Sequence, residues 1–345
     1  MAHLATFSPQ LSPAQPAALR EPSPHTAGGG MFWSPGIGLG AGIILELAGD
    51  IDSLSQRIAQ LPERAGCGGK GRPMVTQYLF MVKTLAAAWA TRSRPGLHTA
   101  LDGLRHLGET LLAQDAALLA TALLNMFHGR PSDGSGAVRL IDGLVRRLAA
   151  PADALSDLEQ DVGSYLAQMG RASGDLETDT VVVTQRLQAD HVHAFILAQQ
   201  VNTLQGRLAE AHARCHSHWL AGPDAGEARA DIDKHGRALD SVMRQLDHIR
   251  EGQGAMMAEA VYLQGLLPTL SAYLSGMDRI GAGIRIAAAG TRTLRAGLDD
   301  LKNVLLAGPA ASGSAHAQLQ AALPSWRMLA ARIAAFPSAP AVGGA

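Results

Sequence analysis

The chain has 345 residues, a formal net charge of -1 and only 17% charged residues. Lysine and arginine are dispersed among aspartate and glutamate, which argues against a basic surface, so we expect no nucleic-acid partner. Hydrophobic residues make up 47% and aromatic residues only 4% of the chain. The excess is alanine and leucine, which favours helix over sheet. With two cysteines, Cys67 and Cys215, a disulfide framework is not expected.

The first segment, residues 1–30, is interrupted by prolines and lacks the basic-then-apolar order of a secretory signal, so it predicts a disordered leader. Residues 31–73 follow as a glycine-rich apolar segment and linker. The run from Met31 to Ile51 is shorter than a membrane-spanning helix and is weakened by its glycines. Two alternatives remain for it: a segment packed against the rest of the protein, or a membrane-active segment. The membrane-active alternative would use Phe32, Trp33, Ile37, Leu39, Ile43 and Ile44.

Helical spacing of apolar residues extends from Thr76 to Met126 and is interrupted at Pro95, which predicts two helices or one helix kinked there. The glycine, proline and serine content of residues 127–136 predicts a loop. From Ala137 to about Leu220 apolar residues recur at alternating gaps of three and four, which predicts one very long amphipathic helix.

A second arm with stricter heptads follows the breaker Ala221–Gly226. Each arm has about eighty residues and would reach ~120 Å as a continuous helix, so the short connection predicts an antiparallel hairpin. Bends are expected near Pro268, and a last helix is expected from Leu323 to Phe336 after a linker. The predicted fold class is all-α, with a long coiled-coil hairpin rod and a helical tail bundle at one end. The rod comprises 161–254 with its tip at 221–226, and the tail bundle comprises 74–126, 137–160, 255–307 and 320–337.

The histidines around the tip raise the question of a metal site. Folding the arms about the tip places His212 near His235 and His216 near Asp231, and such pairs on facing helices can bind a metal ion. The apolar seam, however, runs through Ala211, Cys215, Ile232 and Leu239. Of the four candidate ligands only His235 lies in that seam, so we expect a turn with solvated or ion-paired side chains, no metal and no cofactor.

The residues at the tip suggest contact with another surface. Trp219 and Leu220 lie just before the turn at Pro223, and an amphipathic tryptophan at the end of a rod suits a lipid headgroup layer or a partner protein. A buried cap on the coiled coil is the alternative. No serine or cysteine is paired with a histidine and a carboxylate at a recognisable spacing, so we expect no catalytic residues and no enzyme. A metal-dependent helical-bundle enzyme would need His212 and His216 to bind metal.

The order of segments resembles a known family. An initial amphipathic helix (TQYLFMVKTLAAAW), two long antiparallel arms and a short last helix with a tryptophan (LPSWRMLAARI) resemble the helical pore-forming toxins of the cytolysin A superfamily. That group includes components of haemolysin BL, of the non-haemolytic enterotoxin and of the xenorhabdolysin type. The resemblance is one of architecture over residues 76–336 and matches no diagnostic motif.

The resemblance implies a protein that is soluble when secreted and then associates with a target-cell membrane, where it oligomerises with itself or with a second toxin component. One feature departs from the family, since inserting members carry a strongly apolar element between the arms and this tip is only WLAGPDAG. We therefore expect a supporting subunit whose partner crosses the membrane, with Met31–Leu47 as the alternative inserting element. A coiled-coil scaffold or adaptor that dimerises or spaces partners is the alternative outside the family.

Overall fold

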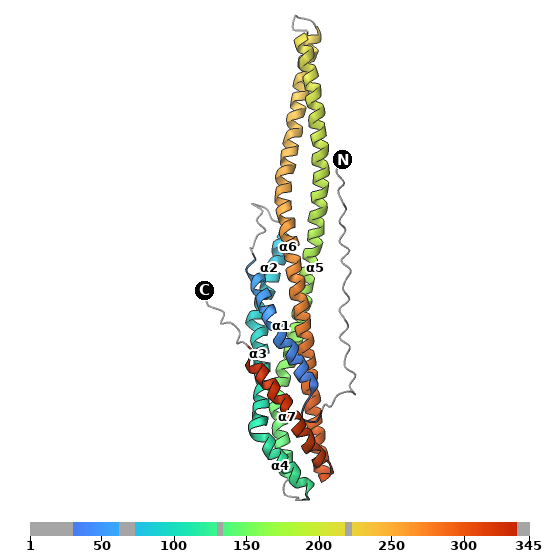
Figure 1. Cartoon of the computed structure of the whole chain (residues 1–345). Coiled ribbons are helices and arrows are strands. Elements are labelled where there is room, and N and C mark those ends of the chain that lie inside the picture. The colour runs from blue at the N-terminus through green and yellow to red at the C-terminus, as the bar shows by residue number, and fades with distance from the viewer. Residues whose placement is uncertain (1–29, 62–72, 130–133, 218–222, 337–345) are drawn as a thin grey trace.

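The computed structural model describes residues 30–61, 73–129, 134–217 and 223–336, and within these ranges the secondary structure is helical. The chain forms one elongated body, with a bundle at one end and a two-helix rod at the other (Figure 1). The helices, in chain order, are α1 (Pro35–Ala59), α2 (Pro73–Ala88), α3 (Arg94–Thr110), α4 (Ala116–Phe127), α5 (Gly134–Ser217), α6 (Pro223–Ala307) and α7 (Ser312–Ala334). The predicted all-α fold with a rod and a tail bundle is confirmed.

The two long arms are α5 and α6, which lie antiparallel along their whole length (Figure 1). Arg214 pairs with Asp231 near the tip, and Lys302 pairs with Asp142 at the opposite end. The predicted hairpin is therefore confirmed. Helix α6 begins at Pro223, inside the predicted breaker Ala221–Gly226. Proline suits the first position of a helix, where its missing N–H would have no partner anyway.

The prolines inside the arms do not divide them. Pro151 lies within α5 and Pro268 within α6, although a bend was predicted near Pro268. A helix can continue through a proline when packing compensates for the lost hydrogen bond. Pro151 is buried against α3 at Gly103, where an added Cβ atom would lie 3.1 Å from the proline Cβ.

The bundle surrounds the lower halves of both arms. Helix α1 packs along α6, α2 and α3 pack along α5, and α7 covers α3 and α4. The core that these helices share extends from Phe32 to Ile333. Helix α7 begins at Ser312, earlier than the predicted Leu323, so much of the predicted linker is helical. Of the helices that the structure describes, α5 and α6 alone continue above the bundle (Figure 1).

The segment from Pro73 to Phe127 is continuous and contains two π-helical turns, Trp89–Ser93 and Leu111–Asp115. The first turn lies just before Pro95, where the sequence predicted a break or a kink. A π turn accommodates the extra residue without ending the helix. The second turn was not predicted, and it places Asp115 where its carboxylate accepts a hydrogen bond from Arg147 at 2.6 Å.

Glycines explain why α1 lies so close to α6. A Cβ atom at Gly40 would overlap the carbonyl oxygen of Gly283 and lie 2.6 Å from the backbone nitrogen of Ala287. A Cβ at Gly290 would lie 2.6 Å from the backbone nitrogen of Ile37. The glycine-rich run that the sequence left open is therefore a helix in backbone contact with the second arm.

Candidate membrane and partner surfaces

The tip is the end of the rod that lies farthest from the bundle (Figure 1). Trp219 and Leu220 lie outside the described residues, and Pro223 is described only as the first residue of α6. Their predicted contact with a membrane or a partner therefore stays a prediction. The helix bounds limit the connection between the arms to the residues between Ser217 and Pro223.

The candidate metal ligands near the tip are placed as follows. His212 is exposed and His235 is half-buried, while the side chain of His216 lies outside the described residues. Asp231 accepts a hydrogen bond from the Arg214 guanidinium at 2.8 Å, which lowers the pKa of this carboxyl. Among the side chains that the structure describes, no three histidine, cysteine, aspartate or glutamate residues lie close enough to hold a metal ion.

The predicted membrane-active residues of the first segment lie on and before α1. Phe32, Ile37 and Ile44 are buried in the core, Trp33 and Ile43 are half-buried, and Leu39 is exposed. Most of the apolar surface that could meet a bilayer is thus covered by this chain. For the segment to reach a membrane, α1 would have to leave α6.

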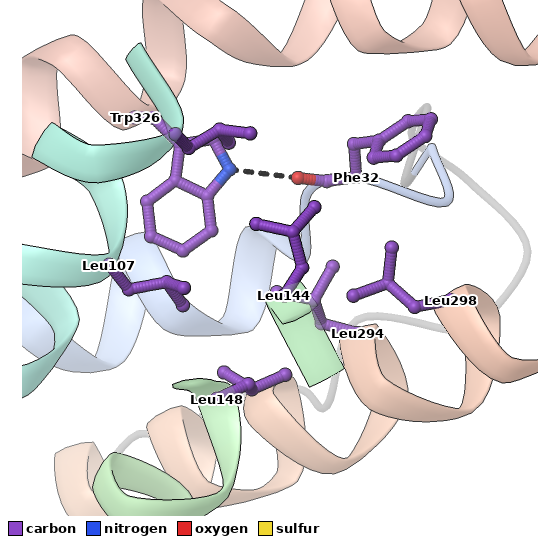
Figure 2. A pocket seen from close by; sticks show the side chains of 8 residues that line it. Phe32, Leu107, Leu144, Leu148, Leu294, Leu298 and Trp326 are labelled. Carbon is purple, nitrogen blue, oxygen red and sulfur yellow. Dashed lines mark hydrogen bonds between the residues drawn. The ribbon is translucent and has the colours of Figure 1, made fainter. Parts of the chain in front are cut away.

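Helix α7 holds the start of α1 in place. The Trp326 indole N–H donates to the carbonyl oxygen of Phe32 at 2.8 Å, and the Met31 backbone N–H donates to Gln318 Oε1 at 2.9 Å. The Trp33 ring meets Trp326 edge-on, with 5.1 Å between the ring centroids. Figure 2 shows this hydrogen bond beside a small apolar cavity. Leucines from α3, the second π turn, α5 and α6 line the rest of it: Leu107, Leu111, Leu144, Leu148, Leu294 and Leu298.

A second set of contacts joins α1 to the residues Trp89 and Arg94 in the middle of the bundle. Asp52 of α1 accepts hydrogen bonds from Trp89 Nε1 at 2.9 Å and from Arg94 Nε at 3.0 Å. The Arg94 side chain is only 3% exposed, and its guanidinium also lies over the Phe336 ring. A charge this deeply buried needs its ion-pair partner. Sequence reasoning missed this pair because the two residues are far apart in the chain and no local spacing marks them.

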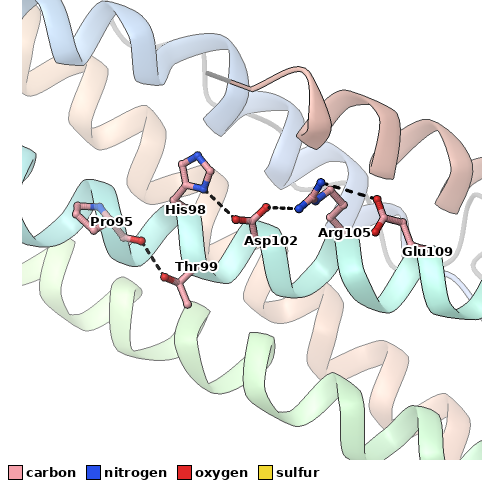
Figure 3. Close-up of polar contacts among 6 residues, drawn as sticks. All are labelled: Pro95, His98, Thr99, Asp102, Arg105 and Glu109. Carbon is pink, nitrogen blue, oxygen red and sulfur yellow. Dashed lines mark hydrogen bonds and ion pairs between the residues drawn. The ribbon is translucent and has the colours of Figure 1, made fainter. Parts of the chain in front are cut away.

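A row of polar side chains follows the surface of α3 (Figure 3). His98 Nδ1 lies 3.1 Å from Asp102, and Arg105 lies 3.2 Å from Asp102 and 3.9 Å from Glu109. These are contacts between residues three or four apart on one helix, and each contributes only a few tenths of a kcal/mol. The row stabilises α3 and contains no nucleophile.

Two tyrosines form a buried pair between the arms. The Tyr165 and Tyr273 hydroxyl oxygens lie 2.5 Å apart. Burial raises the pKa of Tyr165, and the neighbouring Tyr273 raises it further. Burial also raises the pKa of Tyr273, although hydrogen bonds with Tyr165 and Ser55 lower it in part. Both phenols are therefore held in their neutral form.

Because both buried phenols stay protonated in the folded chain, we expect the folded protein to lose stability at alkaline pH. Above the ordinary tyrosine pKa of 10.0, the unfolded chain loses phenol protons that the folded chain keeps. The free energy of unfolding should therefore fall by up to about 1.4 kcal/mol per pH unit for each tyrosine. Urea unfolding at about pH 8 and about pH 11 measures this fall. The double variant Y165F/Y273F should show a smaller fall, and an unchanged fall would contradict the assignment.

The chain is similar to known proteins in its structure. No family model matches the chain, and no curated protein matches it. Solved structures do match. The Bacillus cereus HblL1 toxin component is 11% identical, with 88% of this chain and 97% of that chain covered and a TM-score of 0.54. Soluble AhlC, from the tripartite alpha-pore forming toxin AHL of Aeromonas hydrophila, is 15% identical, with 84% and 97% covered and a TM-score of 0.54.

The XaxAB pore complex from Xenorhabdus nematophila matches at 8% identity, with 88% of this chain and 96% of that chain covered and a TM-score of 0.52. The chain therefore shares the fold of these three structures. At these identities the likeness establishes the fold alone, but it extends over nearly the whole length of each toxin chain. The predicted resemblance is confirmed at that level.

Among the residues that the structure describes, one helical stretch, Tyr78–Phe127, is long and apolar enough to cross a membrane, as judged by length and composition only. A third of its most apolar window is buried in the bundle. On α4 its exposed side chains include Leu118, Leu124 and Phe127. Core helices of soluble proteins meet the same criterion, so this stretch does not by itself identify an inserting element.

Proposed function

We propose that the chain is a component of a multicomponent α-pore-forming toxin. The observation that carries the proposal is the match of 84–88% of this chain to three toxin structures, each covered over 96–97% of its own length. Two of those structures are described as a toxin component or as part of a tripartite toxin, and one as a pore complex. In this proposal the protein is secreted in soluble form and associates with a target-cell membrane together with partner subunits.

Within such a toxin, we place the chain as a supporting subunit. The connection between Ser217 and Pro223 is too short to cross a bilayer, since a membrane helix needs about 20 apolar residues. The alternative inserting segment, Met31–Leu47, begins at the α7 contact and is held by backbone-close packing on α6. Both features favour a partner that supplies the membrane-crossing element.

Leakage assays test this proposal. The purified chain is mixed with dye-loaded liposomes or red cells, alone and with the products of neighbouring genes. We expect little leakage from the chain alone and strong leakage when a partner is added. Absence of both leakage and membrane association in every mixture would overturn the proposal. A coiled-coil scaffold would give that result, since it would not float with liposomes or form larger assemblies on them.

The tip supplies a prediction for membrane or partner contact. Replacing Trp219 with alanine should weaken liposome flotation by about tenfold, because a partly inserted indole contributes roughly 1.4 kcal/mol. Met328→Ala is the control, since Met328 is a large apolar residue that is 61% exposed on the bundle and lies outside Tyr78–Phe127. Equal binding by the two variants would remove the tip from the contact surface.

A further inference from the structure

The end of the bundle that lies opposite the tip carries an exposed apolar surface. The end of α4, the start of α5, the end of α6 and the start of α7 lie at this end (Figure 1). The 3₁₀ turn η4 (Pro309–Ala311) joins α6 to α7 there and contacts α4. We define the base as this end of the bundle, with four large apolar side chains that are 39–65% exposed: Leu124, Phe127, Val304 and Leu306. Apolar side chains gathered on an exposed surface are typical of a contact site.

Contacts between the helices bring the apolar side chains of the base together. Lys302 of α6 pairs with Asp142 of α5, so counting along both helices toward the base places Leu306 beside the first two turns of α5. The Phe127 ring covers the start of α7, since a Cβ atom at Gly313 would lie 3.0 Å from it. Helix α4 thus ends at the same level as α6, and the four side chains share one end surface.

The two segments that supply these side chains are uncharged. Residues 116–129 and 303–326 contain no aspartate, glutamate, lysine or arginine, although 17% of the chain consists of these residues. Apart from two histidines, their polar side chains are hydroxyls and amides. Residues 130–133, which include Arg130 and Asp133, lie outside the described residues and are not part of the base. An end surface of this composition can leave water without burying an acidic or basic side chain.

The charged residues nearest the base on the two described arms stand back from it by the same distance. Arg139 is the first charged residue of α5, and Lys302 is the last of α6. At ~1.5 Å per residue, each lies ~8 Å from the end of its helix. The uncharged stretch is longer along α4 and α7, where it ends at Asp115 and Arg327. The uncharged depth of the base thus matches the ~5–10 Å that interfacial helices reach into a bilayer.

The helices next to the tip lack a comparable uncharged depth. Arg214 lies one turn before the end of α5, and Glu227 and Arg229 lie within the first two turns of α6. Charged side chains such as these are costly to place in hydrocarbon. The tip therefore suits lipid headgroups or a partner protein, whereas the base suits the layer beneath the headgroups.

The size of the base argues against a second copy of the chain as its occupant. The four side chains expose roughly 400 Å², so pairing two copies base to base would bury roughly 800 Å², below the ~1,000 Å² of a specific interface. A bilayer sets no such limit, because it can surround the whole base. The exposed small residues Pro309 and Ala310 of η4 then meet lipid as well.

We propose that the base docks in the interfacial layer of a lipid bilayer, down to the level of Arg139 and Lys302. Phe127 and the three aliphatic side chains of the base exchange water for acyl chains, which is the favourable term. The two basic residues stay at the level of the lipid headgroups, where long basic side chains are stable. The proposal adds a lipid contact at the end opposite the tip. It deepens the proposed function, on which it rests for the presence of a target membrane.

Site-specific fluorescence quenching tests the docking and its depth. Both native cysteines are replaced by serine, and a dye is attached to A307C at the base or to the control M328C, whose position on α7 lies beyond Arg327. The vesicles contain phosphatidylcholine and phosphatidylglycerol, with bromine atoms either near the top or near the end of the acyl chains. We expect the upper bromines to quench the A307C dye at least about tenfold more than the M328C dye, and the lower bromines to quench both weakly.

Other outcomes separate the docking from the toxin function. An unquenched A307C dye would overturn the docking, and leakage with a partner in the same sample would leave the toxin function intact. Stronger quenching by the lower bromines would overturn shallow docking in favour of insertion into the hydrocarbon. A dimer in solution that the variant L306D dissociates would show that the base binds a second copy instead. Quenching at A307C without leakage in any mixture would support the docking and count against the toxin function.

L306D provides the second test, since it places a carboxylate in the base, whereas the control M328D places one on the bundle surface. Both are made in the Trp219→Ala chain, so that the tip contributes little to flotation. L306D should weaken liposome flotation at least about tenfold relative to M328D, because its carboxylate would enter the apolar layer. Both monomers should keep their helix content, since the replaced side chains are 65% and 61% exposed. Equal flotation by the two variants would overturn the proposal.

Discussion

Replacing Gly40 with valine should lower the free energy of unfolding by about 3 kcal/mol or more, since overpacking a tight contact typically costs 1–3 kcal/mol and here the clash is with backbone. The new Cβ would overlap the Gly283 carbonyl oxygen and the Ala287 backbone nitrogen. Neither group can rotate away as a side chain can. Helix α1 must therefore move off α6 along much of its length. Urea unfolding followed by circular dichroism measures the loss.

Gly49 is the matched control on the same helix. A Cβ atom at Gly49 would meet nothing within 4 Å, and the residue is exposed. Gly49→Ala should stabilise the protein by up to about 1 kcal/mol, because alanine has the higher helix propensity. If the Gly40→Val variant had the same free energy of unfolding as the Gly49→Ala variant, the close approach of α1 to α6 would be refuted.

The Gly40 variant also separates the two membrane hypotheses. If Met31–Leu47 is the inserting element, loosening α1 should increase liposome binding by the chain alone. If the tip makes the membrane contact, liposome binding should depend on Trp219 and stay unchanged when α1 loosens. Flotation of the Gly40→Val protein at a temperature where the arms remain folded compares the two.

The long arms could be predicted from the sequence because their signal is repetitive and local. Apolar residues such as Leu155, Val162 and Met169 recur with a heptad period, and all three are buried in the structure. The short breaker before Gly226 then allowed only a fold-back. Each step needed the helix period and a connection length, with no knowledge of distant contacts.

Contacts between distant segments could not be predicted in this way. The glycines of α1 lower its helix propensity, and this cost can be read from the sequence. The contact with Gly283 that compensates for it involves a residue far along the chain, which no local pattern marks. The Asp52–Arg94 pair and the π turn at Leu111 likewise depend on which helices meet.

Trp326→Ala is expected to cost about 3–5 kcal/mol, the range for removing a large buried aromatic side chain. The Trp326 indole is 1% exposed. It fills the space that α7 shares with α3 and with the segment that precedes α1, and Gly108 of α3 leaves room for its ring. The variant also leaves the Phe32 carbonyl oxygen without its N–H donor, which adds to the cost. Thermal or urea unfolding measures the total.

Trp326→Phe separates the ring from the hydrogen bond. Phenylalanine keeps most of the apolar volume but cannot donate to Phe32, so this variant should lose about 1–2 kcal/mol. In both variants, amide hydrogen exchange should increase first over Met31–Gly42, because α7 holds that end of α1 through Trp326 and Gln318. Exchange that rose evenly over α1, α5 and α6 would show that Trp326 supports the whole bundle. Faster exchange confined to the start of α1 would instead mark this end as the place where the first helix begins to leave the arms.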